Sequence, residues 1–141
     1  MIFPLTLPKP GAIFRVPCPH GSADGLALGR LAKELSSPLI VITENAGNAQ
    51  RLLEEISWFV PELSVHLLPD WETLPYDHFS PHPDLVSERL ATLYQITNNA
   101  CNVVILPATT ALLRLPPEEY LAAHTFMLKK GQHLNLDALR A

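Results

Sequence analysis

The stretch NVVILPATTALLRL, residues 102–115, begins with apolar residues at successive positions from Val103 to Leu106. A second run of this kind, LIVIT, spans Leu39 to Thr43. Strands that face solvent on one side alternate apolar and polar residues, whereas strands covered by helices on both sides are apolar throughout. The two runs therefore predict strands that are covered on both faces, in a layered α/β domain with a largely parallel sheet.

Helical patterns separate the short apolar runs. Apolar residues recur at helical spacing from Leu28 to Leu35, from Ala49 to Phe59 and from Val86 to Tyr94. Asn45 and Asp84 precede the second and third patterns and are predicted to cap those helices. Further strands are predicted at residues 13–16, 64–68 and 125–128, and shorter helices at 108–115 and 118–123.

The composition limits the possible functions. The chain has 141 residues, of which 10 are basic and 14 are acidic, so its net charge of −4 does not favour tight binding of nucleic acid. Cys18 and Cys101 stand far apart without the spacing of a zinc site or a disulfide framework, which fits a reducing cytoplasm. Neither a signal sequence nor an apolar run of membrane-spanning length is present, so we expect a cytoplasmic protein with no membrane contact.

The segment VPCPHGSADG, residues 16–25, follows the first predicted strand, where a nucleotide-binding domain would carry its phosphate loop. With Gly21 as the last glycine of such a loop, Ser22 occupies the lysine position and Ala23 the hydroxyl position. Both side chains that bind phosphate and magnesium are therefore missing. We expect no bound cofactor and no ATPase activity, although Ser22 and Gly25 leave weak anion binding as an alternative to a plain turn.

A second candidate site is LPDWETLPYDHFSPHPDLVSERL, residues 68–90, which leaves a predicted strand at its carboxyl end. Its acid-base candidates are Asp70, Glu72, Asp77, His78, His82 and Asp84. No activated nucleophile accompanies them, and Pro81 prevents His78 and His82 from sharing a regular helical face, which disfavours a metal site. An enzyme that uses Asp70, Glu72, Asp77 and His78 remains an alternative.

The favoured interpretation of this loop is structural. Its apolar side chains, Trp71, Leu74, Tyr76 and Phe79, would pack as a lid that the prolines stiffen. A third alternative is a weak single-stranded DNA-binding module in which Trp71, Tyr76 and Phe79 stack on bases. The arginines Arg30, Arg51, Arg89 and Arg114 lie beside helical patterns and are expected at the surface.

Three blocks occur in order: LPDWETLPYDHFSPHPDLVSERLATLYQI, NVVILPATTALLRL and FMLKKGQHLNLDALR. Together they resemble the N-terminal module of the bacterial transcription-repair coupling factor family, Mfd. The resemblance implies a helicase-like domain similar to domain 1a of the excision-repair protein UvrB, with a degenerate P-loop, over residues 1–122. Residues 123–141 would then begin the second, UvrA-binding type of domain.

The resemblance also implies a function. Members of the family are ATP-dependent DNA translocases that displace stalled RNA polymerase and recruit UvrA, and their motors, which use ATP and magnesium and hold duplex DNA, lie in other parts of the chain. This segment would be a non-catalytic scaffold. Its candidate partner surface comprises Lys129, Lys130, Trp71 and Tyr76, and residues 69–84 are too few for the long aromatic hairpin of UvrB.

Overall fold

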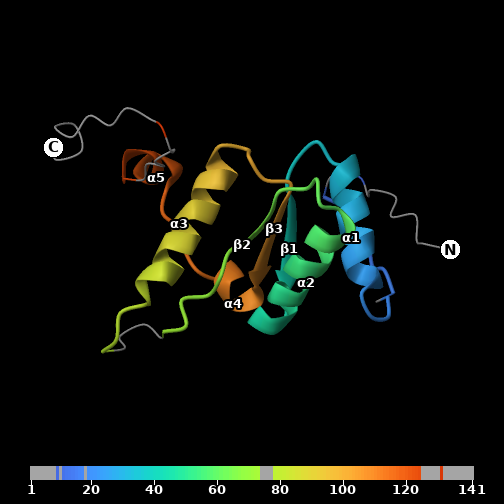
Figure 1. The fold of residues 1–141 in the computed structure, drawn as a ribbon, viewed down its shortest axis with the longest axis horizontal. Helices are drawn as coiled ribbons and strands as arrows, with labels where there is room; N and C mark the ends of the chain where they lie inside the picture. The colour runs from blue at the N-terminus through green and yellow to red at the C-terminus, as the bar shows by residue number, and fades with distance from the viewer. Residues whose placement is uncertain (1–8, 10, 18, 74–77, 125–130, 132–141) are drawn as a thin grey trace.

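A computed structural model describes residues 9, 11–17, 19–73, 78–124 and 131 of the chain (Figure 1). The elements in chain order are α1 (Ala23–Glu34), β1 (Leu39–Thr43), α2 (Ala46–Phe59), β2 (Val65–Leu67), α3 (Pro83–Thr97), β3 (Val103–Pro107), α4 (Ala108–Ala111) and α5 (Glu118–His124). The central strands and the long helices fall where the apolar patterns predicted them. The predicted helix at 118–123 is confirmed as α5.

The three strands form one parallel sheet in the order β1-β3-β2. Val103 of β3 lies opposite Leu39 on one side and Val65 on the other, so β3 is the central strand. Helices α1 and α2 lie on one side of this sheet, and α3 and α5 lie on the other (Figure 1). The prediction of a layered α/β domain with a parallel sheet is confirmed.

Two apolar cores enclose the central strand. The core on the α1 and α2 side is built from Ala32, Val41, Ala49, Leu52, Ile56, Val103 and Ile105. The core on the α3 and α5 side is built from Leu68, Leu93, Cys101, Val104, Leu106 and Leu121. Since alternate residues of β3 enter opposite cores, this strand is covered on both faces, as its sequence predicted.

The same prediction is wrong for β1. Ile40 and Ile42 are 53% and 60% exposed, whereas Val41 and Thr43, on the opposite face, are buried. The difference arises because α3 packs against β2, at the other edge of the sheet from β1. A run of apolar residues therefore did not distinguish a central strand from an edge strand.

Helices α1 and α2 approach closely at two glycines. A Cβ atom on Gly29 would lie 2.9 Å from Cγ2 of Val60, and one on Gly25 would lie 2.9 Å from Oε2 of Glu55. Cβ atoms do not approach other atoms this closely, so a larger residue at either glycine would force the neighbouring side chain or the helix to shift. The packing brings the start of α1 beside the acidic and basic side chains of α2.

Several boundaries differ from the prediction. Asn45 caps α2 as predicted, through a hydrogen bond of 2.9 Å from Asn48 N. For α3 the cap is His82 rather than Asp84, because Pro83 already adopts the first helical position. Residues 13–16 are not a strand, and Ile13 is 92% exposed. The helix predicted at 108–115 ends at residue 111, and the strand predicted at 125–128 lies outside the described residues.

Candidate functional site

The turn before α1 occupies the place where a phosphate loop would lie. Gly21 has a positive φ of 61°, Ser22 precedes the helix, and Ala23 is its first residue. The hydroxyl of Ser22 does not cap α1 but donates a hydrogen bond of 3.0 Å to Oε1 of Glu55. At this turn the chain therefore presents no ammonium group, and its one hydroxyl is engaged by a carboxylate.

Arg51 of α2 links the start of α1 to α2. One guanidinium nitrogen lies 2.8 Å from Oδ2 of Asp24 and the other lies 2.7 Å from Oε2 of Glu55. The hydrogen bond from Arg51 lowers the pKa of Asp24, against the opposing effect of burial, and the same bonds raise the pKa of Arg51. Two carboxylates thus neutralise the guanidinium of Arg51 at this helix N-terminus, and their negative charge opposes the approach of a phosphate group.

The Asp24–Arg51 contact makes stability depend on pH. The pKa of Asp24 is lower in the folded chain than its ordinary value of 3.8, so its stabilising contribution is present above pH 3.8 and is lost as the pH falls through the folded-state pKa. The contribution should not exceed about 1 kcal/mol, since the Arg51 side chain is 40% exposed. We expect Asp24→Asn to unfold at a lower urea concentration than the unchanged chain at pH 7. Its stability should also decrease less than that of the unchanged chain in acid, because the contact that protonation of Asp24 breaks is already absent.

Glu44→Gln is the control for this measurement, because Glu44 is exposed and its charge is removed in the same way. Equal midpoints for Asp24→Asn and Glu44→Gln at pH 7 would show that the Asp24–Arg51 contact does not stabilise the fold.

The other candidate site begins at the carboxyl end of β2. Asp70 is partly buried and its Oδ1 accepts a hydrogen bond of 2.8 Å from its neighbour Trp71 N. Glu72 is exposed and has a positive φ of 57°, and His78 is exposed. Asp77 lies outside the described residues. Among the residues that the structure describes, no three metal-ligating side chains gather in one place.

Arg89 of α3 holds the start of this loop. It is only 3% exposed, and its guanidinium carbon lies 4.3 Å from the centre of the Trp71 ring. It also donates a hydrogen bond to the carbonyl of Pro69. Burial lowers the pKa of Arg89, while the nearby charge of Asp70 opposes that effect. The expectation that Arg89 is a surface residue is therefore wrong.

The apolar lid is confirmed only at its beginning. Trp71 packs on Arg89, but Phe79 is 81% exposed, so Phe79 does not pack as predicted. Leu74 and Tyr76 lie outside the described residues. A second bond fastens the same region, since Thr92 of α3 donates a hydrogen bond of 2.7 Å to the carbonyl of Leu67. Helix α3 thus fixes the end of β2 and the first residues of the loop.

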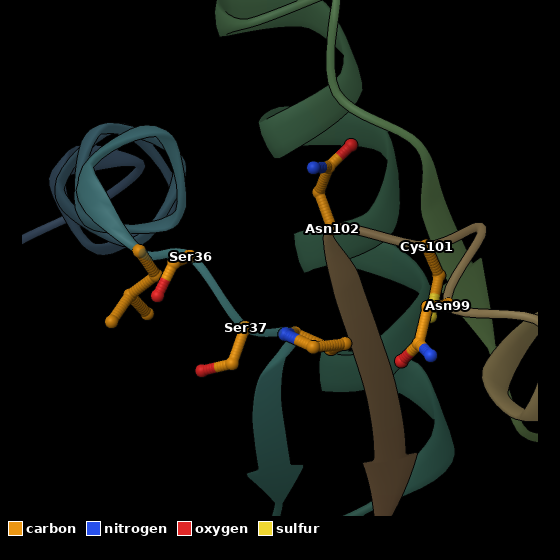
Figure 2. Close-up of a pocket in the computed structure, with 7 residues that line it drawn as sticks. Ser36, Ser37, Asn99, Cys101 and Asn102 are labelled. Atoms are coloured by element: carbon orange, nitrogen blue, oxygen red, sulfur yellow. The ribbon is translucent and has the colours of Figure 1, made fainter.

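A pocket of about 240 Å³ lies at the opposite end of the sheet, between the segment that enters β1 and the segment that enters β3 (Figure 2). Its lining residues are Leu35, Ser36, Ser37, Pro38, Asn99, Cys101 and Asn102. None of them is charged. Burial raises the pKa of the Cys101 thiol, which disfavours the reactive thiolate. Asn102 has a structural role, because its Oδ1 accepts a hydrogen bond from Ser64 N.

The chain is similar to known proteins over most of its length. No family model matches the chain. It is 42% identical over 120 residues to the transcription-repair-coupling factor of Escherichia coli K12, a match that covers 85% of this chain and 10% of that protein. The chain belongs to the transcription-repair-coupling factor family.

Other coupling factors match the same way. The one from Haemophilus influenzae is 39% identical over 121 residues, and the one from Bacillus subtilis is 27% identical over 119 residues. Each match covers 84% of this chain and 10% of the relative. The chain therefore corresponds to about a tenth of its relatives' length, as the N-terminal module that the sequence resembled.

No helix in the described part of the chain combines the length and the apolar character needed to cross a membrane. The candidate partner surface is only partly described. Trp71 is partly buried and packs on Arg89, whereas Tyr76, Lys129 and Lys130 lie outside the described residues.

Proposed function

We propose that this chain is a non-catalytic scaffold of a transcription-repair coupling factor. The observation that carries the proposal is the start of α1, where Asp24 and Glu55 neutralise Arg51 and where Ser22 and Ala23 replace the residues that would hold phosphate and magnesium. A nucleotide would have to displace the two carboxylates that already pair with the guanidinium of Arg51. ATP, magnesium and duplex DNA would be bound by other parts of the coupling factor.

The scaffold would be a helicase-like domain similar to UvrB domain 1a, covering residues 1–122. A parallel sheet between helical layers and a turn at Gly21 in the phosphate-loop position support this proposal. Residues 123–141 would begin a second domain that recruits UvrA, with Lys129 and Lys130 as its candidate contacts. The whole factor would displace stalled RNA polymerase in the cytoplasm.

The rival functions have less support. Asp70 and His78 share no hydrogen bond or ion pair among the described residues, so acid-base catalysis by this loop lacks an assembled centre. One face of the Trp71 ring lies against a buried arginine, which leaves less of the ring for stacking on a base. The net charge of −4 also disfavours binding of a DNA single strand.

Two measurements test the proposal. Titration of residues 1–141 with magnesium and ATP should give neither heat in calorimetry nor a rise in melting temperature, because a ligand that binds the native state must stabilise it. Saturable binding would contradict a non-catalytic scaffold and would reopen the enzyme alternative.

The second measurement concerns UvrA. In a full-length Escherichia coli coupling factor that carries this chain in place of its matching segment, Lys129→Glu with Lys130→Glu should weaken co-elution with UvrA. Arg30→Glu, a charge reversal at an exposed position of α1, is the control and should leave co-elution unchanged. Unchanged UvrA binding by the double lysine variant would remove these residues from the contact.

A further inference from the structure

The two faces of the sheet are covered unequally. On one face α1 and α2 both contribute to the core, and Val41 of β1 is buried beneath them at 8% exposure. On the other face α3 packs against β2, and α5 packs against α3. Ile40 and Ile42, which point to that second face, remain more than half exposed. The uncovered surface is confined to β1, at one edge of the sheet.

The dimensions of α/β layers explain this gap. Neighbouring strands lie about 4.8 Å apart, whereas packed helices lie about 8–10 Å apart, so one helix covers about two strands. Helix α3 therefore accounts for the half of the second face near β2. On that face α5 packs against α3 and the short α4 contacts β1, yet neither of them covers Ile40 and Ile42, which stay more than half exposed.

The exposed strand has the composition of a covered one. None of the residues of β1, Leu39 to Thr43, is charged. Free edges and faces of sheets that stay in solvent usually carry charged side chains that prevent association. Two exposed isoleucines next to an existing helical layer therefore mark a surface that another element covers.

We infer that the Ile40–Ile42 face of β1 is the docking site of an amphipathic helix supplied by another part of a coupling-factor chain. The coupling factor of Escherichia coli is about ten times as long as the segment that matches this chain, so such relatives have ample further polypeptide. The helix would lie beside α3 and continue its layer over β1, with its apolar side on the two isoleucines. This inference rests on family membership and does not depend on UvrA recruitment.

Cysteine labelling tests the inference directly. Ile42→Cys is introduced into residues 1–141 and into the full-length Escherichia coli coupling factor that carries this chain in place of its 120 matched residues. The rate of maleimide labelling is measured by mass spectrometry of the peptide that contains the introduced cysteine, and it is expressed relative to the rate in urea. We expect labelling to be at least about tenfold slower in the full-length protein, because a docked helix removes the side chain from solvent.

Val41→Cys is the matched control, since it lies on the same strand but faces the α2 side and should label slowly in both proteins. Equal rates for Ile42→Cys in both proteins would overturn the inference. Slow labelling of residues 1–141 that speeds up on dilution would also overturn it, because a second copy of the chain would then be the occupant. The remaining alternative is that a strand, and not a helix, is added beside β1. Hydrogen exchange would detect it, because the β1 amides that point away from β3 would then become newly protected.

Discussion

Ile105→Ala is expected to lower the free energy of unfolding by about 2–5 kcal/mol, the range for truncating a fully buried isoleucine. Ile105 is 0% exposed in the centre of β3 and belongs to the core beneath α2. The other residues of this core come from α1, α2, β1 and β3, so they cannot all relax into the space that the side chain leaves. Since domains of this size have about 5–15 kcal/mol of stability in total, the change could remove a large share of it.

Ile42→Ala provides the matched control, because the same atoms are removed from the neighbouring strand. Ile42 is 60% exposed, so its truncation in residues 1–141 should cost less than about 1 kcal/mol. Both values come from urea unfolding followed by circular dichroism. Equal losses for the two variants would mean that Ile42 is buried in solution and that the exposed face of β1 does not exist in the isolated chain.

The strands show how far an apolar pattern predicts the fold. Successive apolar residues located β1 and β3 correctly, although only β3 is buried on both faces, which is the condition that normally requires such a pattern. The pattern could not show which strand is central, since that depends on strand order. Residues 13–16 have the same apolar character but form no strand in the structure, because β-propensity acts only where a neighbouring strand offers its hydrogen bonds.

The candidate site could also be predicted only in part from the sequence. The positions of Gly21, Ser22 and Ala23 could be predicted, because a turn between apolar patterns is a local feature. The Asp24–Arg51–Glu55 cluster could not be predicted, since Asp24 and Arg51 are 27 positions apart in sequence and meet only because Gly25 and Gly29 let α1 approach α2. The spacing of Arg51 and Glu55 at i, i+4 was the one local signal.

The prediction that Arg89 lies at the surface was wrong for a comparable reason. Helical spacing put it on the flank of α3, and its partner Trp71 is 18 positions away on the far side of a proline-rich loop. An arginine near a tryptophan in sequence carries no signal for a buried pair. Only the path of the loop from β2 back to α3 brings the indole ring over the guanidinium.

Arg89→Ala is expected to lower the free energy of unfolding by about 1–3 kcal/mol. The variant loses the hydrogen bond to the Pro69 carbonyl and the contact with the Trp71 ring, and it leaves a space under that ring. Part of the loss is offset, because burial of the guanidinium without a bonded carboxylate is itself unfavourable, as its lowered pKa indicates. The offset is why the expected loss stays below that of Ile105→Ala.

Arg51→Ala is the comparison that shows whether burial or ion pairing determines how much an arginine stabilises the fold. Arg51 makes two ion pairs but is 40% exposed, so its removal should cost no more than about 1 kcal/mol. A Trp58→Phe background leaves Trp71 as the one fluorophore of its kind, and Arg89→Ala should shift its emission to longer wavelength as the ring gains water contact. If Arg51→Ala proves the more damaging variant and Trp71 emission does not move, ion pairs rather than burial would govern the stability of this module, and Arg89 would not hold the loop against α3.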